Sequence, residues 1–272
     1  MTKFILFMLL FSMREQGFSI KKISSKHPKQ QEWVTEGDDA FLQEILSQPF
    51  TYLGSGNHTY AFASEDGEYV LKFFKQKHMR THSLLPLSKE KKERRIKERN
   101  KSYNSYKIAY ETLPELTGTL YLHLTKTSHL KKFITIIDQH KKTHTLNADK
   151  FEFLLQRRAK VGFAYIEELL EKKQKERALS ALCSYLELIK TRAKKGISDH
   201  DRQLFKNYGF IGNRAIEIDI GDFAIDSESA LPVNIQKELQ EVSAQILDFV
   251  STYAPELSQQ IKRRIDQIVK ST

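Results

Sequence analysis

Apolar and polar positions along the chain follow two different periods. Short runs of branched and aromatic residues, separated by glycine, asparagine or aspartate, are typical of β-strands joined by turns and dominate residues 50–156. Beyond them, apolar residues recur every three or four positions, which predicts amphipathic helices. The pattern predicts strands within 50–64 and at 68–74, 118–124, 132–138 and 150–156, and helices at 38–46, 88–113, 161–170, 176–195, 234–253 and 255–269.

A glycine turn and a lysine stand out among the predicted strands. Gly54-Ser55-Gly56 joins the first two strands, and glycine lets a backbone approach a ligand without a Cβ atom in the way. Lys72 follows sixteen residues after Gly56, inside an apolar run where a lysine needs a reason. The alternative is a plain β-meander whose lysine is exposed.

A second polar stretch, residues 196–222, carries several oxygen-bearing side chains. Asp199, Asp201 and Asn207 lie in a region without helical periodicity, and Asp219 lies in a predicted strand at 215–222. Oxygen ligands at loop and strand ends can hold Mg²⁺ together with phosphate oxygens. A nearby carboxylate can orient an attacking hydroxyl. By itself, the stretch also fits an ordinary hairpin with solvated carboxylates.

Taken in chain order, these motifs resemble the protein-kinase-like fold. The resemblance covers roughly residues 50–223 and implies an α+β protein with two lobes. The expected N-lobe, 37–158, contains an antiparallel sheet and one long helix. The expected C-lobe, 159–272, is mostly helical and reduced. An apolar N-terminal segment and a polar linker, 1–36, precede both.

In the first lobe, the resemblance implies a site for the phosphates of ATP. Gly54, Ser55 and Gly56 would cover the phosphates, and Lys72 would hold the α- and β-phosphates. Glu98, in the predicted helix, would pair with Lys72; the alternatives are Glu93 and Glu111.

In the second lobe, the resemblance implies a metal site and a base. Asn207 and Asp219 would hold Mg²⁺, and Asp201 would orient the acceptor hydroxyl, with Asp199 as the alternative. At the end of the first lobe, where the strand at 150–156 leads into the hinge, the chain around Gln156 would bind adenine through backbone groups of residues 155–157.

The sequence departs from the family pattern at several positions. Thr59 stands where a third glycine is expected, and Ile220 replaces a phenylalanine after Asp219. Asp201 and Asn207 are six residues apart instead of five, and no peptide-substrate platform follows. These departures leave two functions open within the fold: a phosphotransferase with an unknown protein or small-molecule acceptor, and a nucleotide-binding, pseudokinase-like interaction module.

Charge suggests a third function. The chain of 272 residues has a formal net charge of +10, and residues 72–107 carry thirteen Lys and Arg against three acids. This basic patch predicts an anionic partner, which is nucleic acid, an anionic membrane surface or an acidic protein, or else it is a solvated helix face.

From the composition we expect a cytoplasmic protein, with membrane association through the N-terminal apolar segment as the alternative. Its one cysteine, Cys183, excludes an internal disulfide and gives no sign of an oxidising compartment. The apolar run at residues 4–11 is too short to span a bilayer, which needs about 20 residues. It predicts a weak membrane-surface anchor, a strand packed on the body, or an incorrectly chosen start codon, and we expect no transmembrane span.

Overall fold

The computed structural model describes residues 17–25, 27–77, 79 and 88–271, so the apolar run at 4–11 lies outside the described residues. The protein is α+β, with two compact units. The first comprises Met1–Arg99 and Tyr121–Leu155, and the second Asn100–Leu120 and Gln156–Thr272. Among the described residues, no helix is both long and apolar enough to cross a membrane.

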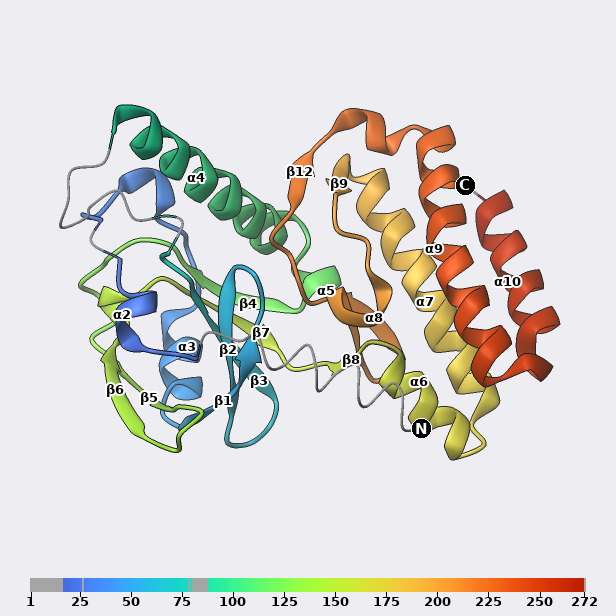
Figure 1. Cartoon of the computed structure of the whole chain (residues 1–272), viewed down its shortest axis with the longest axis horizontal. Helices are drawn as coiled ribbons and strands as arrows, with labels where there is room; N and C mark the ends of the chain where they lie inside the picture. Colours follow the sequence, from blue (N-terminus) through green and yellow to red (C-terminus); the bar gives the residue numbers. More distant parts are fainter. Residues whose placement is uncertain (1–16, 26, 78, 80–87, 272) are drawn as a thin grey trace. The chain divides into compact units, whose positions relative to one another are not determined.

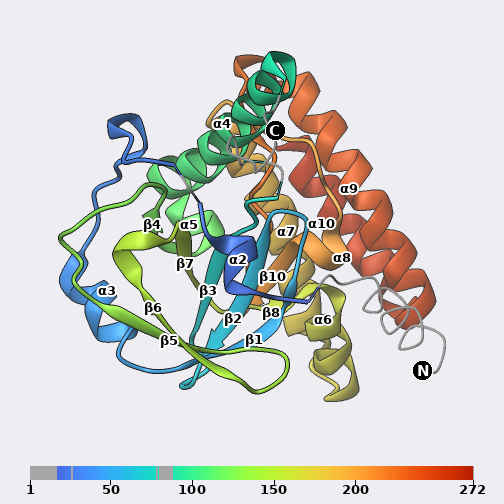
Figure 2. The ribbon, with the colours of Figure 1, turned by 60° about the vertical axis from the view of Figure 1, so that its left-hand side comes forward.

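The first unit is built on a seven-stranded sheet in the order β4-β7-β3-β2-β1-β5-β6 (Figure 2). Strands β1, β2 and β3 are antiparallel neighbours, as the turn signals predict. However, β1 pairs in parallel with β5, so, contrary to the prediction, the sheet is not antiparallel throughout. The strands are β1 (Phe50–Ser55), β2 (Thr59–Ser64), β3 (Tyr69–Phe74), β4 (Thr119–His123), β5 (Phe133–Ile137), β6 (Thr143–Asn147) and β7 (Phe153–Arg157).

The segment before the sheet, predicted as a polar linker, packs against the first unit. Phe18, Ile23 and Trp33 are buried. The Phe18 ring makes edge-to-face contacts with Tyr60 and Phe62, at centroid distances of 5.4 and 5.0 Å. Widely spaced apolar residues in a polar segment thus anchor it, and the segment forms the short elements α2 (Ile20–Ile23) and η1 (Gln31–Trp33). The next helix, α3 (Asp39–Ile45), lies where the sequence predicts one at 38–46.

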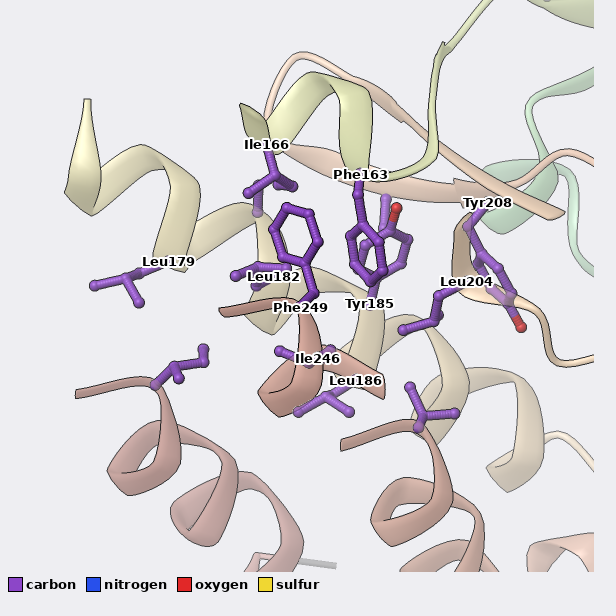
Figure 3. Close-up of a cluster of buried hydrophobic side chains, with 14 of the residues drawn as sticks. Phe163, Ile166, Leu179, Leu182, Tyr185, Leu186, Leu204, Tyr208, Ile246 and Phe249 are labelled. Atoms are coloured by element: carbon purple, nitrogen blue, oxygen red, sulfur yellow. The ribbon is translucent and has the colours of Figure 1, made fainter. Parts of the chain in front are cut away.

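Helices form the core of the second unit (Figure 1). Their apolar faces meet in one cluster, in which Phe163 stacks on Phe249 at a centroid distance of 4.1 Å (Figure 3). Helix α4 (Lys89–Thr112) contributes residues to both units. The remaining helices are α5 (Pro114–Thr117), α6 (Gly162–Glu171), α7 (Lys175–Lys194), α8 (Leu204–Asn207), α9 (Pro232–Tyr253) and α10 (Ser258–Lys270), with short 3₁₀ turns η2 (Ala148–Lys150), η3 (Ser227–Ala230) and η4 (Pro255–Leu257).

The polar stretch at 196–222 contributes strands to two small sheets of the second unit. One has the order β11-β10-β8 and the other pairs β12 with β9. Gly196, predicted to end the preceding helix, has a φ of +69° there, a conformation that favours glycine. The strands are β8 (Lys160–Val161), β9 (Ile197–Asp199), β10 (Tyr208–Ile211), β11 (Arg214–Glu217) and β12 (Phe223–Ile225).

Candidate functional site

Strand pairing in the first unit places the glycine turn and the strand lysine in one row. Gly54 on β1 lies opposite Ala61 on β2, and Ala61 lies opposite Lys72 on β3. Directly paired residues share a face of the sheet. Lys72, which is half-buried, therefore shares its face with two residues of minimal side-chain volume. The positively charged Lys72 therefore lies in line with Ala61 and Gly54, two positions at which little side-chain volume is present.

The two glycines of the turn are not required by packing within the described chain. A Cβ atom added at Gly54 or Gly56 would meet no atom within 4 Å, and neither residue has a positive φ. The turn is closed by a hydrogen bond of 3.0 Å from the amide of Gly56 to the carbonyl of Thr59. The backbone of this turn is therefore open to an approaching ligand.

Lys75, which the sequence did not single out, holds the glycine turn from the opposite face of the sheet. Ser55 pairs with Tyr60, which pairs with Phe73, and Lys75 is two residues further along. Its ammonium donates to Ser55 Oγ at 3.1 Å and to the carbonyl of Gly56 at 2.5 Å, and lies 4.7 Å from the Tyr60 ring centroid. Only the register of the three strands shows that this lysine reaches the turn.

The predicted carboxylate partners of Lys72 lie on α4. Glu93 and Glu98 are exposed. Glu111, the third alternative, belongs to the second unit and lies 3.7 Å from the ammonium of Lys107, one helical turn away. The pairing of Lys72 with Glu98 stays a prediction.

Gln156 is buried, and its side chain has a structural role in the second unit. Its amide group donates to the carbonyl of Thr117 at 2.5 Å and lies 3.3 Å from the carbonyl of Glu217. Because the side chain is engaged in this way, the backbone around it is the part that could meet adenine, as the resemblance implies.

In the second unit, three predicted residues come together around Asn207. The Asn207 side-chain amide donates to the carbonyl of Asp201 at 2.7 Å. The Asn207 carbonyl accepts from the amides of Ile218, at 2.7 Å, and Asp219, at 3.2 Å. These bonds take the chain out of the β10–β11 ladder, so β11 ends at Glu217 and the predicted strand at 215–222 is shorter than expected.

The resulting arrangement leaves suitable oxygen atoms for a cation. Asp201 and Asp219 are half-buried, and Asn207 is buried. Because the Asn207 amide nitrogen is committed to Asp201, its Oδ1 is the atom left to face a ligand. A cluster of three or more His, Cys, Asp or Glu side chains able to hold a metal is absent from the described residues. Two protein oxygens plus phosphate oxygens are nevertheless a donor set that suits Mg²⁺.

Asp199 and Asp201, the two candidate bases, differ in exposure. Asp199 is only 2% exposed, and its Oδ1 accepts a hydrogen bond from the amide of Asp201 at 3.1 Å. Its carbonyl accepts from Arg202 Nε at 3.0 Å. Asp199 thus fixes the backbone of the loop, whereas Asp201 is the more accessible carboxylate.

Helix α9 braces this loop through a polar stripe that the sequence analysis missed. Arg202 lies 3.1 Å from Glu238 Oε1 and 2.8 Å from Glu241 Oε2. Gln245 donates to the carbonyl of Arg202 at 3.1 Å and accepts from the amide of Leu204 at 3.3 Å. The spacing of three and four residues puts Glu238, Glu241 and Gln245 on one helix face. The spacing of these three polar residues, beside the apolar stripe of α9, was the sequence signal from which their shared face could have been predicted.

A fully buried arginine also supports the loop at 199–207. Arg192, at the end of α7, donates to the carbonyl of Ile197 at 2.9 Å and to Glu238 at 2.5 Å, and lies 3.3 Å from Glu217. Burial raises the pKa of Glu217 well above its usual range, against the effect of Arg192. Tyr208 donates to Glu217 at 2.8 Å. The loop therefore rests on a buried charged network shared by α7, α9 and the strands around it.

The comparisons with known proteins do not establish a family. The sequence matches no protein-family model. It also matches no curated protein. Similar solved structures include three of WbdD, described as a bifunctional kinase-methyltransferase and once crystallised with the kinase inhibitor LY294002. Identity is 14–16%, TM-scores are 0.36–0.40, and the match covers 78–80% of this chain but only 43–45% of WbdD. TM-scores below 0.5 leave a shared fold undemonstrated.

Proposed function

We propose that the protein is an ATP- and Mg²⁺-dependent phosphotransferase of the kinase-like superfamily. In the first unit, Gly54, Ser55, Gly56 and Lys72 would contact the phosphates of ATP. In the second, Asn207 and Asp219 would hold Mg²⁺, and Asp201 would accept the proton of an acceptor hydroxyl. Glu98 would support Lys72, and the backbone beside residue 156 would bind adenine.

One observation carries the proposal most strongly: the bond network around Asn207. It joins Asp201 and Asp219, which lie eighteen positions apart in the sequence, through the side chain and the carbonyl of one residue. The motif order identified these three residues before any geometry was known. An ordinary hairpin with solvated carboxylates gives no reason for a buried asparagine to tie them together.

In the proposed reaction, the acceptor hydroxyl oxygen forms a bond to the γ-phosphorus of ATP. The bond between that phosphorus and the β,γ-bridging oxygen breaks, ADP leaves, and the hydroxyl proton moves to Asp201. A bound Mg²⁺ would neutralise charge on the phosphate oxygens. The protein supplies mainly position and charge, since phosphoryl transfer asks for little covalent chemistry from side chains.

Thermal unfolding with nucleotides tests the binding step. A ligand at 100 times its dissociation constant stabilises a protein by about 2.7 kcal/mol, and each kcal/mol raises Tm by roughly 2–4 °C for a domain of this size. We expect a rise of several degrees with millimolar ATP and Mg²⁺. No rise with ATP, ADP or GTP, in Mg²⁺ or Mn²⁺, would contradict both the enzyme and the binding-module functions.

Turnover then separates those two functions. Autophosphorylation or slow ATP hydrolysis, measured against an Asp199→Asn/Asp201→Asn double variant, is expected for the enzyme. Binding of Mg·ATP without phosphoryl transfer above that control would leave the pseudokinase-like module, for which the altered catalytic loop is the motivation.

A further inference from the structure

The first three turns of α4, residues 89–98, form an exposed cationic helix whose lysine and arginine side chains have no part in the proposed phosphotransferase. Six of these ten residues are Lys or Arg and three are Glu. Five of the six cations are exposed: Lys89, Lys91, Lys92, Arg94 and Lys97. The density of positive charge is therefore a property of the folded surface as well as of the sequence.

The cations surround this part of the helix. At about 100° per residue, Lys92 and Arg94 lie about 160° apart around the axis, and Lys91 and Lys97 lie about 120° apart. A helix cationic on several sides suits a ligand that offers anions on more than one side. Ile96, half-buried, is the one apolar residue in the ten.

That distribution argues against a membrane surface. A helix that lies in a bilayer interface needs a broad apolar face to enter the acyl boundary, with its cations gathered on the other side. Residues 89–98 have no such face. The groove of a duplex, by contrast, presents phosphates along both walls, and the major groove of B-DNA, about 12 Å wide, admits an α-helix.

We propose that residues 89–98 of α4 bind double-stranded DNA through its phosphate backbone. Because the contacts are charge contacts from lysine and arginine, binding does not depend on base sequence. Each phosphate contact releases counterions and contributes about −0.9 to the slope of log K against log salt concentration. This inference is independent of ATP binding.

Fluorescence anisotropy with a labelled 20-base-pair DNA duplex tests the proposal, using the full chain at several NaCl concentrations. The variant Lys91→Gln/Lys92→Gln/Arg94→Gln/Lys97→Gln keeps helix propensity, since glutamine is close to lysine and arginine. We expect it to bind about tenfold or more weakly at 100 mM NaCl, with a salt slope reduced by about one for each residue.

The control is Lys142→Gln/Lys194→Gln/Lys262→Gln/Arg263→Gln, which removes the same charge from exposed positions elsewhere. It should keep most of the affinity, and far-ultraviolet circular dichroism should show both variants folded. The proposal is overturned if wild type does not bind the duplex, or if both variants lose affinity equally. It is also overturned if the duplex fails to bind while phosphatidylserine vesicles bind wild type but not the α4 variant.

Discussion

The glycine turn of the first unit and the loop at 199–207 of the second are held in different ways. The turn is held by backbone bonds from Gly56 to Thr59 and from Lys75 to His58 and by the Lys75 side chain, and a Cβ added at Gly54 or Gly56 would meet no atom within 4 Å. The loop is fixed by Asp199, by the polar stripe of α9 and, through the buried network, by Arg192. In the proposed function, the turn that would admit ATP is lightly held, whereas the loop that would orient the reacting groups is held from several sides.

This contrast has an energetic basis. Buried ion pairs contribute little net stability, but removing one partner leaves an uncompensated buried charge, which costs about 3–5 kcal/mol. The network under the loop therefore makes its geometry expensive to distort. No comparable charged network supports the glycine turn among the described residues, so changes there should alter binding more than stability.

The largest expected effect is on turnover, from Asp201→Asn. A positioned base contributes about 10²–10⁴-fold in rate, and its removal should leave ATP affinity nearly unchanged because the base acts on the acceptor. Rate and affinity can be measured on the same preparation. Asp199→Asn should lower turnover less, since Asp199 orients the backbone. Loss of turnover in Asp199→Asn alone would reverse these two roles.

Arg192→Met should be the most destabilising single substitution of those considered. It removes the positive charge buried between Glu217 and Glu238, at a cost of about 3–5 kcal/mol. Urea unfolding of the second unit measures it. Arg177→Met, in the same helix but on the surface, is the matched control and should stay within about 0.5 kcal/mol. Equal midpoints for the two variants would show that the network does not brace the loop.

Glu152 gives a pH-dependent test within the first unit. It is 2% exposed, and burial raises its pKa to about 7, against a hydrogen bond from Ser25. The folded state therefore keeps a proton that the unfolded state releases near pH 4.5, so stability falls as pH rises from about 4.5 to 7.

The free energy of unfolding should fall by about 3 kcal/mol over this pH range, at about 1.4 kcal/mol for each pH unit. Glu152→Gln should remove it, so the stability of the variant relative to wild type should grow across this range and then level off. Urea unfolding at pH 4.5, 6 and 8 measures the difference. A difference independent of pH would contradict the raised pKa.

The smallest effect concerns Lys75. If it holds the glycine turn in place, Lys75→Met should weaken ATP binding by about fivefold, which is about 1 kcal/mol, the usual contribution of one hydrogen bond. Lys77→Met, two residues away and exposed, is the control. Amide exchange of residues 56–58 should accelerate only in Lys75→Met. Unchanged exchange would show that the bonds of Lys75 do not order the turn.

Most elements of the fold could be predicted from the sequence because their signals are local. Helix α7 and its end follow from apolar spacing and from the glycine at position 196, and β1 to β3 follow from alternation and turn residues. The parallel pairing of β1 with β5 could not be predicted, since it depends on a register between distant segments. Phe18 was underestimated because a single apolar residue in polar surroundings has no period.

The candidate site likewise contains residues that could be predicted from the sequence and residues that could not. Asp201, Asn207 and Asp219 were predicted from type and order, and the structure brings them together. Glu238 was not, because a polar residue on an amphipathic helix is usually solvated, and only tertiary packing puts it against two arginines. Lys72 remains on its predicted strand, with its pairing to Glu98 still to be measured.

The most direct test is calorimetric titration of ATP with and without Mg²⁺, for wild type and Asp219→Asn. Wild type should bind ATP more tightly when Mg²⁺ is present, and Asp219→Asn should lose most of that gain because a charged oxygen ligand is removed. Asp248→Asn, an exposed carboxylate on α9, should behave as wild type. ATP affinity that ignores Mg²⁺, or a gain that survives in Asp219→Asn, would contradict a metal site at Asn207 and Asp219.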